Sequence, residues 1–109
     1  MLSLLITACG RQGDAESLVK DFISQNAVNP DKVVLLDFGN LDSTKVIKDS
    51  VIQTLQEREN PVFKKDINYA VKTSGRMLYF LRTQLVYEGD TLRQTFYFDE
   101  QLQQVVAIK

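Results

Sequence analysis

The chain of 109 residues carries few of the side chains that enzymes use most often. It contains no histidine, which excludes Ser-His-Asp and Cys-His nucleophilic sites. Its one cysteine, Cys9, excludes an intrachain disulfide and a multi-cysteine zinc site. Glu57 and Glu59 are two residues apart on a predicted helix and do not face each other, and Asp99 and Glu100 lie in a predicted turn, where acidic residues are common. We therefore expect a protein that is not an enzyme and that needs neither a metal nor a cofactor.

The one cysteine follows a short apolar segment. Residues 1–8 read Met-Leu-Ser-Leu-Leu-Ile-Thr-Ala, so that Ile6, Thr7 and Ala8 directly precede Cys9. A branched apolar residue, two small residues and a cysteine resemble the lipobox of bacterial lipoproteins. The resemblance implies that the Cys9 thiol is acylated and that residues 1–8, the remnant of a signal peptide, are removed. The apolar run is too short for a transmembrane helix, so such a protein would be anchored to the membrane without spanning it.

The segment lacks one feature of a complete signal peptide. No Lys or Arg precedes Cys9, although a signal peptide normally opens with positive charge, and we expect the true start to lie upstream of Met1. The alternative is a short buried strand with a core cysteine, because free Cys is often buried. Residues 9–13 are then expected to be the lipidated cysteine and a flexible tether, Gly-Arg-Gln-Gly. By the same resemblance, the lack of an acidic residue after Cys9 favours the outer membrane of the cell envelope.

The rest of the chain has the composition of one folded domain, residues 14–109. Hydrophobic residues make up 44% and charged residues 25% of the chain, which argues against disorder. The net charge is −1. A nucleic-acid-binding protein normally has a clear excess of positive charge, so nucleic acid is not an expected partner.

Apolar spacing predicts two helices in the first half of the domain. The first covers residues 14–27, with Asp14 as its N-cap, and ends before Asn29-Pro30. The second begins at Asp49 or Ser50 and ends before Asn60-Pro61. Between them, residues 32–38 form an apolar run typical of a strand that is buried on both sides, extended by residues 45–47 beyond a bulge at Gly39. Residues 64–73 fit a helix or a strand, and we favour the strand.

The last third predicts an antiparallel hairpin. Residues 77–87 and 92–98 alternate between apolar and polar positions, and Glu88-Gly89-Asp90 lies between them. A type II′ turn at Gly89-Asp90 pairs Tyr87 with Leu92. A last strand, residues 103–108, follows the turn at residues 99–101. A two-residue turn would place Gln103, Val105 and Ala107 on the core face. We favour the three-residue turn, which places Leu102, Gln104, Val106 and Ile108 there.

These elements predict an α+β fold, in which an N-terminal helix and a second short helix pack on a curved antiparallel sheet of four to five strands. The arrangement resembles the cystatin-like and NTF2-like folds. Its marks are Leu78-Tyr79-Phe80, Thr95-Phe96-Tyr97-Phe98 and Val105-Val106-Ala107-Ile108. The chain also resembles small lipoproteins common in Bacteroidetes.

Two hypotheses for a site follow. Phe80, Arg82, Arg93 and Tyr97 share the amphipathic face of the hairpin, where Arg beside Tyr can form a cation–π contact. This face, unless the second helix covers it, would bind an envelope protein, a peptide or a glycan, with the lipid anchor holding the protein to the membrane. Asp37 interrupts an apolar strand. The NTF2-like resemblance offers the alternative of a periplasmic small-ligand carrier or enzyme, whose apolar pocket contains Asp37.

Overall fold

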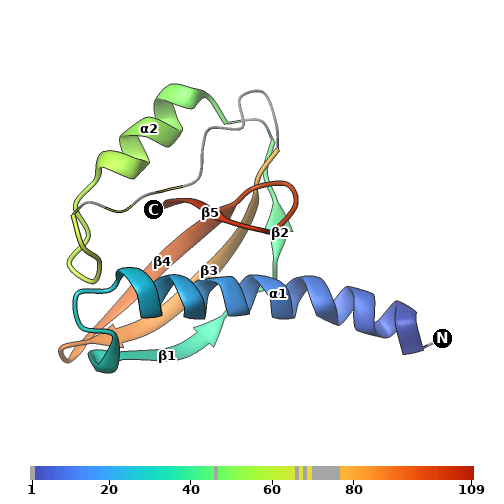
Figure 1. The fold of residues 1–109 in the computed structure, drawn as a ribbon, viewed down its shortest axis with the longest axis horizontal. Helices are drawn as coiled ribbons and strands as arrows, with labels where there is room; N and C mark the ends of the chain where they lie inside the picture. The colour runs from blue at the N-terminus through green and yellow to red at the C-terminus, as the bar shows by residue number, and fades with distance from the viewer. Residues whose placement is uncertain (1, 46, 66, 68, 70–76) are drawn as a thin grey trace.

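The fold consists of a five-stranded antiparallel sheet with a long helix on one face and a short helix on the other (Figure 1). The computed structural model describes residues 2–45, 47–65, 67, 69 and 77–109. The elements are α1 (Leu2–Asn26), the 3₁₀-helix η1 (Pro30–Lys32), β1 (Val33–Phe38), β2 (Asp42–Ser43), α2 (Asp49–Glu57), β3 (Tyr79–Tyr87), β4 (Asp90–Phe98) and β5 (Val105–Ile108). The predicted α+β architecture is therefore confirmed.

The strands follow the order β1, β3, β4, β5, and β2 pairs with β3 on the same side as β1. The hairpin of β3 and β4 is the longest pairing, running from Tyr79 opposite Phe98 to Tyr87 opposite Asp90. It forms the centre of the sheet. Every described pairing is antiparallel, so each strand presents alternate side chains to the two faces.

The helix α1 lies across one face of the sheet and supplies four buried residues to the core. Ala15, Val19, Phe22 and Ile23 are buried, and their spacing of three and four residues places them on one side of the helix. Phe22 meets Phe63 edge to face at a ring-centre distance of 5.2 Å and Phe96 at 6.1 Å, and Phe63 meets Phe96 at 6.1 Å. Tyr69 stacks on Phe22 at 6.0 Å, and burial raises the pKa of its hydroxyl. We call the side chains of Phe22, Phe63 and Phe96 the aromatic cluster.

The helix begins at Leu2, upstream of the expected start at Asp14, and it runs through the stretch expected to be a flexible tether. Gln12 explains why residues 10–13 stay helical. Its Nε2 donates hydrogen bonds to Glu16 Oε2 and to the carbonyl of Gly39, both at 2.9 Å, and its Oε1 accepts one from the backbone N–H of Leu41 at 2.8 Å. These bonds fix the helix to the segment between β1 and β2. The first turns of α1 extend past the sheet (Figure 1).

β1 is an edge strand, and the expectation that both of its sides are buried is wrong. Val34 and Leu36 are each 53% exposed, because α1 covers one face of β1 only. The irregularity in pairing lies between Leu35 and Asp37, ahead of the bulge expected at Gly39. The predicted strand at residues 45–47 is also wrong, because Lys45 and Ile47 belong to no strand. The chain pairs with β3 earlier, through β2. Val46 lies outside the described residues.

The turn between β3 and β4 is Glu88-Gly89, one residue earlier than predicted. Both residues have positive φ, 51° and 85°, as a type I′ turn requires. Tyr87 therefore pairs with Asp90, and Leu92 pairs with Leu85. The partner of Tyr87 is therefore two residues earlier in β4 than predicted. Because the side-chain period of a strand is two, each side chain stays on its predicted face.

β5 begins at Val105, two residues after the predicted start, and all four of its residues are buried. An irregularity in its pairing with β4 splits them between the two faces. Val105 and Ile108 join the core beneath α1, whereas Val106 and Ala107 face α2. The core positions expected from the three-residue turn are thus right for Leu102 and Ile108. They are wrong for Val106, which faces α2, and for Gln104, which is exposed.

The predicted second helix is confirmed as α2, nine residues long. It packs over β5 on the face opposite α1. Its buried Ile52 contacts a small cluster with Leu78, Val106 and Ala107, and Gln56 Nε2 donates a hydrogen bond to the carbonyl of Val106 at 2.9 Å. Residues 64–73 lie largely outside the described residues, and the described ones among them, residues 64, 65, 67 and 69, belong to neither a helix nor a strand.

Truncating the aromatic cluster will test its contribution to stability. Phe96 is fully buried, so we expect Phe96→Ala to lower the free energy of unfolding by about 3–5 kcal/mol, through lost burial and the cavity left behind. Val34→Ala is the control, and its half-exposed side chain should change stability by about 0.5 kcal/mol or less. Urea denaturation measures both. Equal effects of the two substitutions on the free energy of unfolding would contradict the burial of Phe96 in the core.

Two glycine substitutions will test the helical start and the turn together. Gly13 lies in α1 with no neighbouring atom where a Cβ would go, so Gly13→Ala should stabilise the fold by roughly 0.4–1 kcal/mol. Gly89 has φ +85°, so Gly89→Ala should destabilise it by about 1 kcal/mol. Thermal unfolding measures both shifts. A flexible tether at residues 10–13 would instead leave Gly13→Ala without effect.

Candidate binding face

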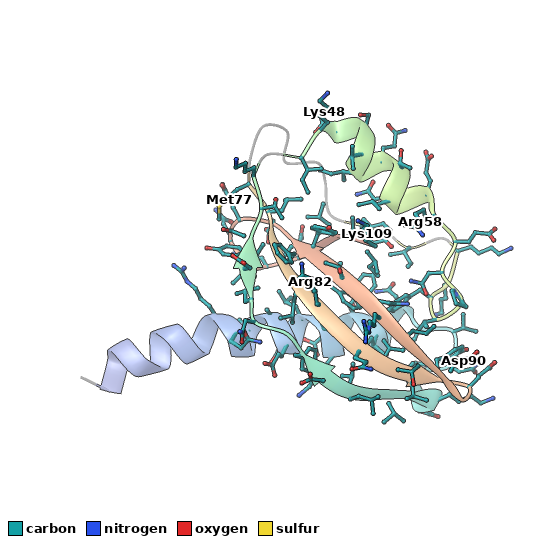
Figure 2. The ribbon with its side chains drawn as sticks, turned by 180° about the vertical axis from the view of Figure 1, so that it is seen from behind. Lys48, Arg58, Met77, Arg82, Asp90 and Lys109 are labelled. Atoms are coloured by element: carbon teal, nitrogen blue, oxygen red, sulfur yellow. The ribbon has the colours of Figure 1, made fainter. Side chains whose placement is uncertain are left out.

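The sheet face opposite α1, which we call the outer face, carries side chains in rows that run across the strands. In the first row, Asp37 of β1, Gln84 of β3 and Arg93 of β4 lie side by side. In the second row, next to it, Arg82 of β3 lies beside Thr95 of β4. Gly39 extends the second row, because its N–H donates to the carbonyl of Arg82 at 2.7 Å. Figure 2 views the sheet from this side, with Arg82 over its middle.

The four residues predicted to form a binding face all lie on the outer face. Phe80 and Tyr97 are cross-strand partners with ring centres 6.2 Å apart. The guanidinium carbon of Arg82 lies 5.3 Å from the ring centre of Phe80, so the cation–π contact uses Phe80 and not Tyr97. Arg93 is exposed in the neighbouring row, diagonal to Arg82.

A hollow of about 300 Å³ opens between these two rows. Asp37, Arg82, Gln84, Arg93 and Thr95 line it from the outer face, and Gly39 closes one side. Its lining is polar and charged. The ion pair found in the described part of the chain joins Lys65 and Glu59, and neither arginine of the hollow takes part in an ion pair there.

Asp37 lies in this hollow and not in an apolar pocket beneath α1. It is exposed, and it is paired in register with Gln84 on the outer face. The space beneath α1 at this point is occupied by apolar side chains such as Leu81, Leu85 and Phe96, each with no exposed surface. A carboxylate at this position is therefore available to bind groups from solvent.

The second helix covers only one end of the outer face. Its cluster includes Tyr97 and Leu78, at the end of β3 and β4 that lies near β5. Arg82 and Arg93 are exposed, and Val34 and Leu36 of β1 remain half-exposed on the far side. The structure thus leaves the predicted face open over β1, β3 and β4.

Cys9 lies inside α1, two residues before Arg11, whose side chain contacts the sheet. Arg11 Nη1 donates to the hydroxyl of Tyr79 at 3.4 Å, and Gln12 binds the segment between β1 and β2 as described above. Acylation of Cys9 would therefore attach a lipid close to the folded body, since three residues of helix advance only about 4.5 Å between Cys9 and Gln12.

Two buried polar side chains were not recognised as unusual from the sequence. Thr83 and Gln94 are cross-strand partners beneath α1, 2% and 7% exposed. Gln94 Nε2 donates to Asn60 Oδ1 at 3.1 Å, but Gln94 Oε1 and Thr83 Oγ1 have no hydrogen-bond partner among the described residues. The alternation of the hairpin could have identified Thr83 and Gln94, because both occupy core positions among apolar residues.

Comparison of the chain with protein-family models, curated proteins and solved structures found no match. The described helices include none with the length and apolar character to span a membrane. Within the described residues, no three His, Cys, Asp or Glu side chains gather where they could hold a metal ion.

Replacing Thr83 will test whether its hydroxyl is unpaired in the core. We expect Thr83→Val to stabilise the fold by about 1 kcal/mol, because it removes a buried polar group without breaking a hydrogen bond. Thr95→Val, on the outer face, is the control and should change little. Chemical denaturation measures both. A clear loss of stability in Thr83→Val would show that the hydroxyl has a partner.

Proposed function

We propose that the chain is a lipid-anchored, non-enzymatic binding module of a bacterial cell envelope. Its outer face binds a partner in the envelope, and acylated Cys9 holds it to the membrane. The observation that carries the binding role is the open outer face. Two arginines that form no ion pair with any other described residue line a hollow there. An aromatic pair, Phe80 and Tyr97, lies on the same face, and the short helix α2 leaves the hollow uncovered.

Exposed arginines and aromatic side chains support a binding role on physical grounds. Arg, Tyr and Phe are enriched in the central parts of protein interfaces, and Arg and Tyr supply much of the binding energy where they become desolvated. The contact of Arg82 with Phe80 restrains a long side chain before a ligand arrives. Less side-chain entropy is then lost on binding.

The anchor is supported by the sequence before Cys9 and by the geometry after it. Ile6-Thr7-Ala8-Cys9 has the residue types of a lipobox. Gln12 connects the helix firmly to the segment between β1 and β2 only three residues later. A lipid on Cys9 would therefore hold the domain close to the bilayer, with little freedom to rotate away from it. We place this anchor in the outer membrane.

Metabolic labelling with an alkyne fatty acid tests the anchor. Cells expressing the native gene should incorporate the label into the protein, and the labelled protein should partition into detergent. Cys9→Ala should abolish both, because it removes the thiol that is acylated. Ser17→Ala, which changes a surface residue of α1, is the control and should label like the unchanged protein.

The outcome of this labelling is decisive for the anchor. Equal incorporation by the unchanged protein and Cys9→Ala, or no incorporation by either, would overturn it. A mature protein that begins at Cys9, measured by mass spectrometry of the purified chain, is the second expected result.

A further inference from the structure

The hollow on the outer face is a small region of positive charge on a chain whose net charge is −1. Two arginines, Arg82 and Arg93, and one aspartate, Asp37, are among the residues that line it. Asp37 and Arg93 are separated by the intervening strand β3, which places their backbones about 9.5 Å apart. The carboxylate therefore does not neutralise Arg93, and no ion pair forms between them.

The two arginines are placed to share one anion. Arg82 pairs with Thr95, and Arg93 pairs with Gln84, which makes the arginines diagonal neighbours on one face, with backbones roughly 7–8 Å apart. Side chains of this length can both reach a group between them. Two like charges this close repel each other, and an oxyanion bound between them would remove that repulsion.

Gly39 provides space beside the arginines. A Cβ built on Gly39 would lie 3.5 Å from the Cβ and from the carbonyl oxygen of Arg82, in ordinary contact with both. A methyl group would therefore fit, but a larger side chain would extend over Arg82 into the hollow. The hollow exists in part because this position carries no side chain.

Hydrogen-bonding groups complete the lining. Asp37 accepts hydrogen bonds, Thr95 and Gln84 both donate and accept them, and all three lie in the same two rows as the arginines. A ligand of this hollow needs one negative group and several hydroxyl donors.

We propose that this hollow binds an acidic sugar, a ring that carries one carboxylate and several hydroxyl groups. The proposal rests on the proposed binding role of the outer face and specifies its ligand. Arg82 and Arg93 hold the carboxylate, and Asp37, Gln84 and Thr95 bind hydroxyl groups. An acidic peptide fits less well, because its carboxylates come without the ring hydroxyl groups that Asp37, Gln84 and Thr95 would bind.

The test is a titration of the full chain carrying Cys9→Ala, followed by the amide resonances in NMR. This substitution removes the acylation site, so ligand binding is measured independently of the anchor. The probes are trigalacturonate, the uncharged galactotriose and triglutamate. We expect trigalacturonate to shift the resonances of residues 82, 84, 93 and 95, and galactotriose and triglutamate to bind at least tenfold more weakly.

Five variants of the same chain, one of them a control, locate the site. Arg82→Ala and Arg93→Ala should each weaken trigalacturonate binding at least tenfold, and Gly39→Leu should do so by filling the hollow while the charge stays constant. Lys20→Ala, which removes an exposed cation from α1, is the matched control and should bind like the parent. Urea denaturation of each variant verifies that a loss of binding is not a loss of folding. Arg82→Lys, which keeps the charge but not the planar fork, should lie between the parent and Arg82→Ala.

Several outcomes would overturn the proposal. Equal affinity for trigalacturonate and triglutamate would show attraction to charge alone, and equal affinity for galactotriose would show that the arginines are not used. Binding that survives both Arg82→Ala and Arg93→Ala would place the ligand elsewhere. If no sugar binds but triglutamate shifts the outer-face resonances, the ligand class is wrong and the proposed binding role stands. If no probe shifts any of these resonances, this proposal fails, while the anchor is judged separately by the fatty-acid labelling.

Discussion

The contact of Phe22 with Phe63 and Phe96 is the interaction on which the rest of the structure depends. It joins three parts of the chain that are far apart in sequence: the end of α1, the segment after α2 and the centre of β4. Backbone hydrogen bonds reinforce the junction, from Val28 to the carbonyl of Val62 and from Lys64 to the carbonyl of Asn26, both at 2.9 Å. Because α1 is fixed to one face of the sheet by these contacts, the other face must be covered by something else or remain open.

The helix α2 covers part of this other face, but it is too short to cover all of it. α2 has nine residues, and only Ile52 among them is buried. It protects β5 and the nearest part of β4. No other described helix covers the outer face of β1 and of the middle of β3. The charged and polar residues of this uncovered area, Asp37, Arg82, Gln84 and Arg93, suit contact with water. The openness of the outer face is thus a consequence of how much apolar surface the two helices provide.

Patterns of period two and period three to four were sufficient to predict the elements and their faces. The alternation in the hairpin placed Arg82 and Arg93 opposite Leu81 and Leu85, and the structure keeps them there despite an error in the turn. The turn was predicted wrongly because Glu88 adopts a positive φ, which a glutamate in the sequence does not indicate. The exposure of Val34 and Leu36 also escaped prediction, since an apolar run cannot distinguish an edge strand from a central one.

The parts of the site that depend on contacts between distant residues could not be predicted. Gly39 and Arg82 are neighbours because the pairing of β1 with β3 continues past Phe38 and Thr83. Gln12 fixes α1 through bonds to a loop 27 and 29 residues away. Neither contact leaves a periodic signal. The same holds for Asp37, whose place on the outer face follows from the irregular pairing between Leu35 and Asp37.

The central claim is that one face of the sheet is buried beneath α1 while the other is open to solvent over β3 and β4. The most direct measurement is the relaxation of methyl protons in NMR caused by a soluble gadolinium complex. We expect strong relaxation for the methyl groups of Val86 and Thr95 on the outer face and little for those of Leu81 and Leu85 beneath α1. Equal protection of all four side chains would contradict the account, because it would mean that another layer covers the outer face.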